Sequence, residues 1–205
     1  DALDRLGLAQ ETVVLFLSDH GEMLGDHGLI AKGAWPYDGI NRVPMIWRWP
    51  GRFPAGRAAD ALASHLDVPA TLLDLAGVPP PPVRSVPDGA TPASRLAPLA
   101  GRSLRPVLAG GAPAVNEEIV IEHEVDHLGL RMRTVVTPDH QLTVYVTDRG
   151  EEPYAELFDR RADPGQLHNR WGDPACTSLV KELKARMLRE LIRTDSRYPL
   201  QHTDF

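Results

Sequence analysis

A proline-rich segment divides the sequence into two blocks of different character. Between Pro79 and Pro113 there are nine prolines, four of them consecutive at positions 79–82. Because proline has no backbone N–H and a fixed φ, such a segment cannot form the interior of a helix or of a central strand. We interpret it as a surface connector with polyproline-like stretches, in preference to a ligand for a proline-recognition module. The sequence thus predicts two domains, at residues 1–115, including the connector at 79–113, and at 116–205.

The block before the connector has the pattern of an α/β layer structure. The unbroken apolar run Thr12–Leu17 is rich in β-branched and aromatic residues, which is typical of a strand buried on both faces of a parallel sheet. A second strand is predicted at Val43–Trp49. A helix is predicted to follow, with Asp67 as its N-cap and Gly77 as its C-cap. Strands and helices interspersed in this way, with a helix-like segment also before the first strand, favour an α/β layer architecture.

The block after the connector has a β pattern followed by one helix. Strands are predicted at 118–124, 130–136 and 141–147, with a shorter one at 155–158. The final helix is predicted to begin with Asp173 as N-cap and Pro174 at the first helical position. Its apolar side chains recur at a spacing of four, at Leu179, Leu183, Met187 and Leu191. We therefore expect a small antiparallel sheet that packs against the C-terminal helix.

Composition excludes several classes of partner. The formal net charge is −6 and the charges are mixed along the chain, so neither nucleic acid nor an anionic membrane is expected as a partner. No apolar run approaches the roughly 20 residues that a membrane-spanning helix needs. The single cysteine, Cys176, excludes an intrachain disulfide and a cysteine-based zinc cluster.

The tripeptide Asp-His-Gly occurs twice within Ser18–Gly33. The first copy begins at Asp19, just past the predicted strand, and ligands bind at the carboxyl ends of strands in open parallel sheets. Asp19 and His20 therefore form either half of a divalent-metal site or a turn cap with a carbonyl-bound imidazole. The second copy, Asp26–Gly28, follows no strand and lies in a glycine-rich loop, which favours an Asx-turn. Lys32 is a surface lysine unless this loop returns it to the metal, where it would neutralise an oxyanion.

Three other histidines are candidates for a site. In "IEHEVDH", strand alternation places Glu122 and Glu124 on one face and His123 on the other. A solvated strand edge near the rim of the site is therefore favoured over a second metal site that would include His127. His65 directly precedes the predicted helix at 67–76, where a pocket-lining position is conceivable, but we assign it no role.

Together these motifs resemble the type I sulfatases, which belong to the alkaline phosphatase superfamily. The stretch "LSDHGEMLGDHGLIAKGAWPYDGINRVPMIWRWPG" is similar to the metal-and-lysine segment of that family. It is followed in order by "HLDVPATLLDLAGVP", "AGRSLRPVLAG" and "AELFDRRADPGQLHN". The resemblance implies the C-terminal part of an alkaline-phosphatase-like α/β core, with a small antiparallel sheet packed by a C-terminal helix.

The resemblance also implies a chemistry. Asp19 and His20 would be ligands of a divalent cation, and Lys32 would contact the sulfate oxygens. Ca²⁺ is the expected ion and Mn²⁺ the alternative, since an imidazole ligand suits a transition ion. The implied reaction is the hydrolysis of a sulfate ester by a metal-bound formylglycine. The alternative on the same scaffold is a phosphonate monoester hydrolase or phosphodiesterase, which the histidine at position 20 favours.

The formylglycine motif of that family, Cys/Ser-x-Pro-x-Arg, is not found in the sequence. Ser85-Val86-Pro87 imitates its start, but Gly89 stands in the place of the arginine. The chain begins without Met and its first residues resemble the tail of a helix, so we expect the C-terminal portion of a longer protein. The expected partners are its missing N-terminal part and a small-molecule sulfate ester; the fragment alone would be inactive. A truncated non-catalytic module is the alternative, a homo-oligomer is compatible with the sequence, and the compartment, cytoplasm or periplasm, is not indicated.

Overall fold

The structure is a computed structural model that describes residues 2–79, 99–125, 128–150, 152 and 154–194. In chain order, its helices and strands are α1 (Ala2–Arg5), β1 (Val14–Leu17), the 3₁₀-helix η1 (Asp26–Gly28), α2 (Asp38–Asn41), β2 (Met45–Arg48), α3 (Asp67–Leu75), α4 (Arg105–Leu108), β3 (Ile119–Val125), β4 (Leu130–Val136), β5 (His140–Thr147), β6 (Tyr154–Asp159), the 3₁₀-helix η4 (Pro174–Cys176) and α5 (Thr177–Thr194). None of the helices described is long and apolar enough to span a membrane. Ser85-Val86-Pro87 and His127 lie outside the described residues.

The first two strands form a ribbon and not part of a parallel sheet. β1 pairs with β2 in antiparallel register, with Phe16 opposite Ile46, and in the described chain no third strand joins them. The expectation of a parallel sheet, with the first strand buried on both faces, is therefore wrong for this chain. Phe16 is 61% exposed and Ile46 58%, because none of the described elements covers that face of the ribbon. An apolar run predicts that a strand has the composition for burial, but it does not specify its neighbour.

Helix α3 begins at Asp67, as predicted, but Asp67 is not its cap. Its carboxylate accepts the backbone N–H of Ser64 at 2.9 Å and that of Arg102 at 2.7 Å, and the side-chain amide of Asn116 at 2.8 Å. An N-cap would instead accept an N–H from the first turn of the helix. The side chain of Asp67 is buried, and it joins α3 to the chain on the far side of the connector. Gly77 does end the helix as predicted, with a positive φ of 68°.

The described end of the connector, residues 99–113, contains a helix that the proline content of the segment hides. Helix α4 includes Pro106 in its first turn, where the missing N–H of proline would have no helical partner in any case. Leu104 and Val107 are buried there. Leu104 is held by a hydrogen bond from its N–H to the hydroxyl of Thr71 at 2.9 Å. This end of the predicted connector therefore packs on α3.

The C-terminal half is an antiparallel meander with strand order β3-β4-β5-β6. The four predicted strands are confirmed, each with ends within two residues of the prediction. The predicted turn at Pro138–His140 is also present, because Thr137 N–H bonds the carbonyl of His140 at 2.8 Å. Alternating apolar residues and a short turn specify such hairpins locally.

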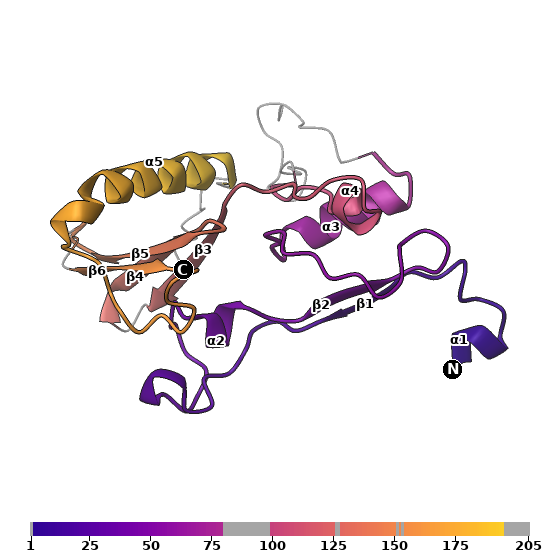
Figure 1. Cartoon of the computed structure of the whole chain (residues 1–205), viewed down its shortest axis with the longest axis horizontal. Helices are drawn as coiled ribbons and strands as arrows, with labels where there is room; N and C mark the ends of the chain where they lie inside the picture. The colour runs from indigo at the N-terminus through magenta and orange to yellow at the C-terminus, as the bar shows by residue number, and fades with distance from the viewer. Residues whose placement is uncertain (1, 80–98, 126–127, 151, 153, 195–205) are drawn as a thin grey trace, which may run out of the picture.

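Helix α5 covers one face of this sheet (Figure 1). Asp173 caps the preceding 3₁₀ turn by accepting the N–H of Ala175 at 2.9 Å, as predicted. The predicted stripe packs inward: Leu183 and Met187 are in the buried cluster with Leu142 and Leu157, and Leu179 and Leu191 border it. Cys176 belongs to the same cluster, and burial raises the pKa of its thiol. Figure 1 places α2, and the loop that leads to it, on the opposite side of the sheet from α5.

Candidate functional site

The first Asp-His pair lies directly past the end of β1. His20 N–H donates to Asp19 Oδ1 at 3.0 Å, and Ser18 Oγ donates to the carbonyl of His20 at 2.8 Å. His65 Nε2 donates to the carbonyl of Ser18 at 2.9 Å, so the N-terminal end of α3 also fixes this turn. Sequence reasoning left the role of His65 open, and its contact is with the backbone that precedes the pair.

The ring of His20 is oriented by its own neighbour. Nδ1 lies 2.8 Å from the carbonyl oxygen of Gly21, and since a carbonyl only accepts, Nδ1 carries the proton. Nε2 therefore has a free lone pair, which lies 3.6 Å from Asp19 Oδ2. An imidazole whose Nδ1–H is held by a backbone carbonyl and whose Nε2 is free is the usual form of a metal-ligating histidine.

Lys32 returns to this pair, as the sequence predicted for a folded-back loop. Its Nζ lies 3.3 Å from His20 Nε2 although the two residues are separated by 12 positions. The backbone N–H of His20 lowers the pKa of the Asp19 carboxyl, and the charge of Lys32 acts in the same direction. One carboxylate oxygen, one imidazole nitrogen and one ammonium thus converge at an exposed position.

The loop that carries Lys32 leaves the pair at Gly21, and a backbone hydrogen bond to Ile40 closes its base. Gly21 N–H donates to the carbonyl of Ile40 at 2.8 Å. A Cβ on Gly21 would collide with the carbonyl of Gly39, so this approach requires glycine. The second Asp-His-Gly copy shapes the tip of the loop: His27 has a φ of +50° and stacks on Tyr37 with ring centroids 3.8 Å apart. Its aspartate, Asp26, is exposed.

The site opens on a groove that runs between the two halves of the chain. Its wall includes Asp19 and His20, together with His65, His123 and Arg160. His123 faces away from Glu122 and Glu124, as predicted, and both glutamates form ion pairs with Arg133 at 3.0 and 2.9 Å. Burial lowers the pKa of His123. The groove thus brings together residues from the loop after β1, the segment that leads into α3 and the C-terminal sheet.

The donor set fits part of a metal site. Among the residues that the structure describes, no group of three or more His, Cys, Asp or Glu side chains could hold a metal ion. Asp19 and His20 alone offer two donors, whereas Ca²⁺ takes six to eight oxygen ligands and transition ions take four to six. The orientation of His20 Nε2 beside Asp19 Oδ2 is compatible with a shared cation. A complete shell needs ligands beyond this pair.

A family comparison covers most of the chain. Residues 25–193 match the family described as N-sulphoglucosamine sulphohydrolase, C-terminal. An N-acetylglucosamine-6-O-sulfatase of Bacteroides thetaiotaomicron is 29% identical over 187 residues, which are 88% of this chain and 30% of that protein. An uncharacterised sulfatase of Escherichia coli, YidJ, is 34% identical over 162 residues, 78% of this chain and 28% of that protein. The chain thus spans about a third of the length of these relatives.

The fold comparison agrees with the sequence comparison. The crystal structure of the phosphonate monoester hydrolase of Agrobacterium radiobacter is similar to this chain, with a TM-score of 0.74 and 25% sequence identity. The similarity covers 95% of this chain and 38% of that one. A crystal structure of a sulfatase from Bacteroides thetaiotaomicron gives a TM-score of 0.71. The mixed helix-and-strand architecture is therefore that of the alkaline-phosphatase-like α/β proteins. The chain belongs to the sulfatase family of the alkaline phosphatase superfamily and corresponds to its C-terminal portion.

Proposed function

We propose that this chain supplies the metal-and-lysine part of a sulfatase that hydrolyses a small-molecule sulfate ester. The observation that carries the proposal is the convergence of Asp19, His20 and Lys32 just past the end of β1. Nε2 of His20 lies 3.3 Å from Lys32 Nζ and 3.6 Å from Asp19 Oδ2. The remaining catalytic groups, including a formylglycine nucleophile, would come from an N-terminal part of the enzyme.

Each of the three residues has a distinct proposed role. Asp19 and His20 would hold a divalent cation, which when bound supplies a Lewis acid next to the ester. Lys32 would bind a sulfate oxygen and neutralise the negative charge that develops there. Its ammonium suits this role because it is a compact charge on a long stem. In the structure, Lys32 donates to the lone pair of His20 Nε2.

The metal is proposed to be Ca²⁺, with Mn²⁺ as the alternative. Calcium prefers oxygen ligands, and the imidazole of His20 shifts the balance toward a transition ion. Metal analysis of the full-length enzyme by mass spectrometry decides between them. Asp19→Ala is expected to lose most of the bound metal, whereas Asp26→Ala, in the second Asp-His-Gly copy, is expected to retain it. Equal loss in both variants would contradict the assignment to the first copy.

A phosphonate monoester hydrolase is the second candidate function. It is favoured by the histidine at position 20 and by the similarity to the Agrobacterium enzyme. Sulfate monoesters and phosphonate monoesters both present a tetrahedral centre with anionic oxygens, so Lys32 could serve either one. The proposal commits to the sulfatase because the matching family and both curated relatives are sulfatases.

Matched substrates test the two candidates. Full-length enzyme is assayed with the sulfate, phosphonate and phosphodiester of one aryl alcohol, together with a 6-O-sulfated glucosamine. The sulfatase proposal predicts the highest kcat/KM for a sulfate. A higher value for either phosphorus ester would overturn it. Lys32→Ala should lower kcat roughly 10²–10³-fold, while Lys181→Ala, an exposed lysine on α5, should leave it unchanged.

A further test concerns the chain taken by itself. Two donors should bind Mn²⁺ only weakly, so a titration of the 205-residue chain followed by electron paramagnetic resonance is expected to give millimolar affinity. No turnover of the ester panel is expected from this chain. Micromolar binding would contradict the view that the pair is part of a larger site and would favour the non-catalytic binding module.

A further inference from the structure

The two faces of the four-stranded sheet carry different side chains. Leu142 on β5 and Leu157 on β6 pack under α5, so strand alternation turns Gln141, Thr143 and Glu156 to the opposite face. Beside apolar side chains such as Phe158, this second face carries polar ones that are nevertheless buried: Gln141 is 1% exposed and Glu156 6%. Burial of an amide or a carboxylate is costly unless each has hydrogen-bond partners. The face is therefore built to receive another polar segment.

That segment is Pro36–Asp38. It follows residues 21–35, the loop that carries Lys32 and is called the Lys32 loop below. Gln141 Nε2 donates to the carbonyl of Pro36 at 2.5 Å. The backbone N–H of Asp38 donates to Gln166 Oε1 at 2.8 Å, and Gln166 is itself buried. Both bonds are made to the backbone, so they fix where the chain runs and not only which side chains it carries.

Between these two bonds, Tyr37 reaches the sheet with its side chain. Its hydroxyl donates to Glu156 Oε1 at 3.0 Å, and Tyr145 donates to Oε2 of the same carboxylate at 2.6 Å. Burial, together with the charge of Glu156, raises the pKa of Tyr37, so the hydroxyl keeps its proton and remains a donor at neutral pH. The ring of Tyr37 is stacked on His27 at an interplanar angle of 9°. Tyr37 therefore links the tip of the Lys32 loop to the sheet.

The loop itself is bent tightly. Positive φ angles occur at four of the five residues 24–28: 49° at Leu24, 102° at Gly25, 50° at His27 and 72° at Gly28. Non-glycine residues in this region cost free energy and persist only where the surroundings hold them. The loop is held by its closure at Gly21 and by backbone bonds of its own, such as Gly25 N–H to the carbonyl of Leu29 at 2.7 Å. The stacked Tyr37 and the bonds on either side of it join the loop to the sheet.

We propose that Tyr37 and Glu156 are positioning residues that use the C-terminal sheet to place Lys32 against His20. This inference rests on the proposed function, because that proposal gives Lys32 its role in catalysis. Lys32 is exposed, and a flexible four-carbon stem does not by itself set the place of the ammonium. The position of the Lys32 backbone determines where the ammonium can reach. A displacement of about 1 Å at a reacting centre can cost roughly 10²-fold in rate. The C-terminal subdomain thereby contributes to the site through a loop from the other half of the chain.

The first experiment is independent of activity. Amide hydrogen exchange of residues 24–38 is measured in full-length protein for wild type, Tyr37→Phe and Tyr154→Phe. Tyr37→Phe preserves the stacked ring and removes only the hydroxyl, whereas Tyr154, on the same strand as Glu156, bonds Asn169 and not the loop, at 2.9 Å. Exchange in this loop should rise roughly tenfold in Tyr37→Phe, the effect of losing one buried hydrogen bond. It should not change in Tyr154→Phe.

The second experiment tests whether the effect passes through Lys32. Tyr37→Phe and Glu156→Gln are each measured in the wild-type and Lys32→Ala backgrounds of the full-length enzyme. We expect each to lower kcat about tenfold with a smaller change in KM in the wild-type background, and to cause no further loss once Lys32 is removed.

The outcomes separate this inference from the proposed function. Equal losses in both backgrounds, or unchanged exchange in Tyr37→Phe, would overturn the positioning role. If wild-type enzyme hydrolyses none of the esters, the proposed function fails, and the exchange measurement still decides whether the sheet holds the loop. A global fall in stability is recognised because exchange would then also rise in β4 and β5.

Discussion

The β1–β2 ribbon and the four-stranded sheet are both antiparallel, but only the sheet is covered on both faces (Figure 1). Helix α5 packs on one of its faces, and the segment Pro36–Asp38 bonds to the other. In the ribbon, the cross-strand pair of Phe16 and Ile46 is more than half exposed. The two regions have similar apolar residues. The difference shows that a strand joins a core because other elements cover it, and not because of its composition alone.

Hydrogen exchange of the chain should show the largest effect of this difference. The backbone amides in the ladder between β4 and β5 are expected to exchange only through global unfolding, because Thr134, Val135 and Leu142 are fully buried there. Those in the β1–β2 ladder should exchange by local opening, roughly 10³-fold faster or more. Equal protection of the two ladders would mean that the ribbon has cover in solution, and the comparison would fail.

Side-chain truncation should separate the two regions by stability. Leu183 is 1% exposed and lies between α5 and the sheet. Leu183→Ala is expected to lower the free energy of unfolding by about 3 kcal/mol, through lost burial and the cavity that remains. Phe16→Ala in the ribbon should cost less than about 1 kcal/mol although it removes a larger side chain. Urea unfolding followed by circular dichroism measures both.

The matched control for this comparison lies on the same helix. Leu188 is 59% exposed, so Leu188→Ala retains the helix and removes no buried contact. Its effect should be within about 0.5 kcal/mol of zero. A cost at Leu188 equal to that at Leu183 would show that helix propensity, and not the cover of the sheet, determines the stability of α5.

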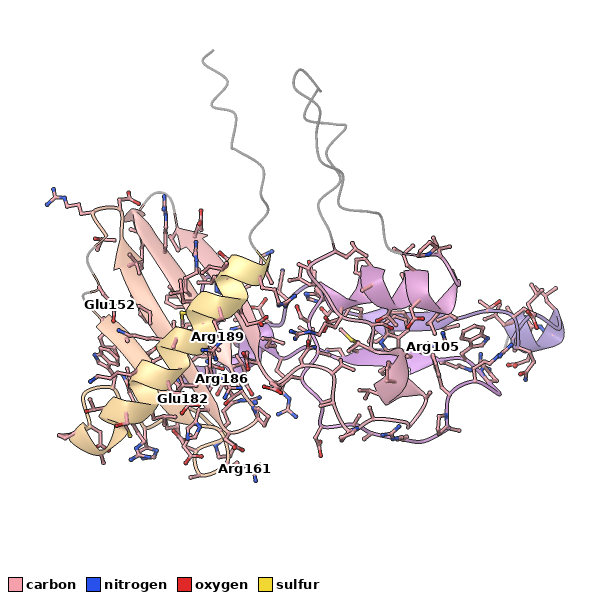
Figure 2. The ribbon with its side chains drawn as sticks, turned by 90° about the horizontal axis from the view of Figure 1, so that it is seen from above. Arg105, Glu152, Arg161, Glu182, Arg186 and Arg189 are labelled. Carbon is pink, nitrogen blue, oxygen red and sulfur yellow. The ribbon has the colours of Figure 1, made fainter. Side chains whose placement is uncertain are left out.

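The next effect concerns Arg186 on α5, which is labelled with Glu182 of the same helix in Figure 2. Arg186 Nε donates to Glu118 Oε2 at 3.0 Å just before β3, and Arg186 also lies 3.6 Å from Glu182. The side chain of Glu118 is only 10% exposed, so Arg186→Met leaves a mostly buried carboxylate without its partner. We expect a loss of about 2 kcal/mol. Arg189→Met, an exposed neighbour on the same helix, should change stability by less than about 0.5 kcal/mol.

Much of the C-terminal half could be predicted because its signals are local. Alternation over seven or eight residues and a turn at Pro138–His140 specify a hairpin without reference to the rest of the chain. The same holds for Asp173 and Pro174 at the start of the last helix. The ribbon could not be predicted in this way. The run Thr12–Leu17 contains no information on the direction of its neighbour, and the neighbour that it has, β2, is about 30 residues away.

The features of the candidate site also differ in whether a local sequence signal predicts them. The place of Asp19 and His20 follows from the end of a strand, and the return of Lys32 follows from a glycine-rich loop. Whether these residues bind metal and substrate stays a prediction. The bond between Tyr37 and Glu156 joins residues separated by 119 positions. Each lies in a stretch that resembles the sulfatases, but neither stretch indicates that the two side chains are in contact. Only the buried glutamate on an otherwise strand-like segment, "YAELFD", could have indicated that its face has a polar partner.

The smallest effect expected is a dependence on pH at the start of α5, on the covered side of the comparison. A hydrogen bond from Arg170 and the N–H of Ala175 lower the pKa of the Asp173 carboxyl. A pKa that is lower in the folded than in the unfolded state stabilises the fold above the unfolded value of about 3.9, and the effect is lost as the pH falls through the folded value. Asp173→Ala should therefore lower Tm at pH 7, and the deficit should shrink below about pH 4.

The charge and the cap at this position can be separated by Asp173→Asn. Asparagine caps as well as aspartate does, but it does not titrate and carries no charge for Arg170, whose Nη2 lies 2.9 Å from Asp173 Oδ2. Thermal unfolding of this variant should keep most of the wild-type Tm at pH 7, and its own Tm should depend less on pH in the acid range. If the Ala and Asn variants instead show the same deficit at pH 7, the ion pair and not the cap holds the start of α5 over the sheet. The cover that distinguishes the sheet from the ribbon would then depend on charge at its first turn.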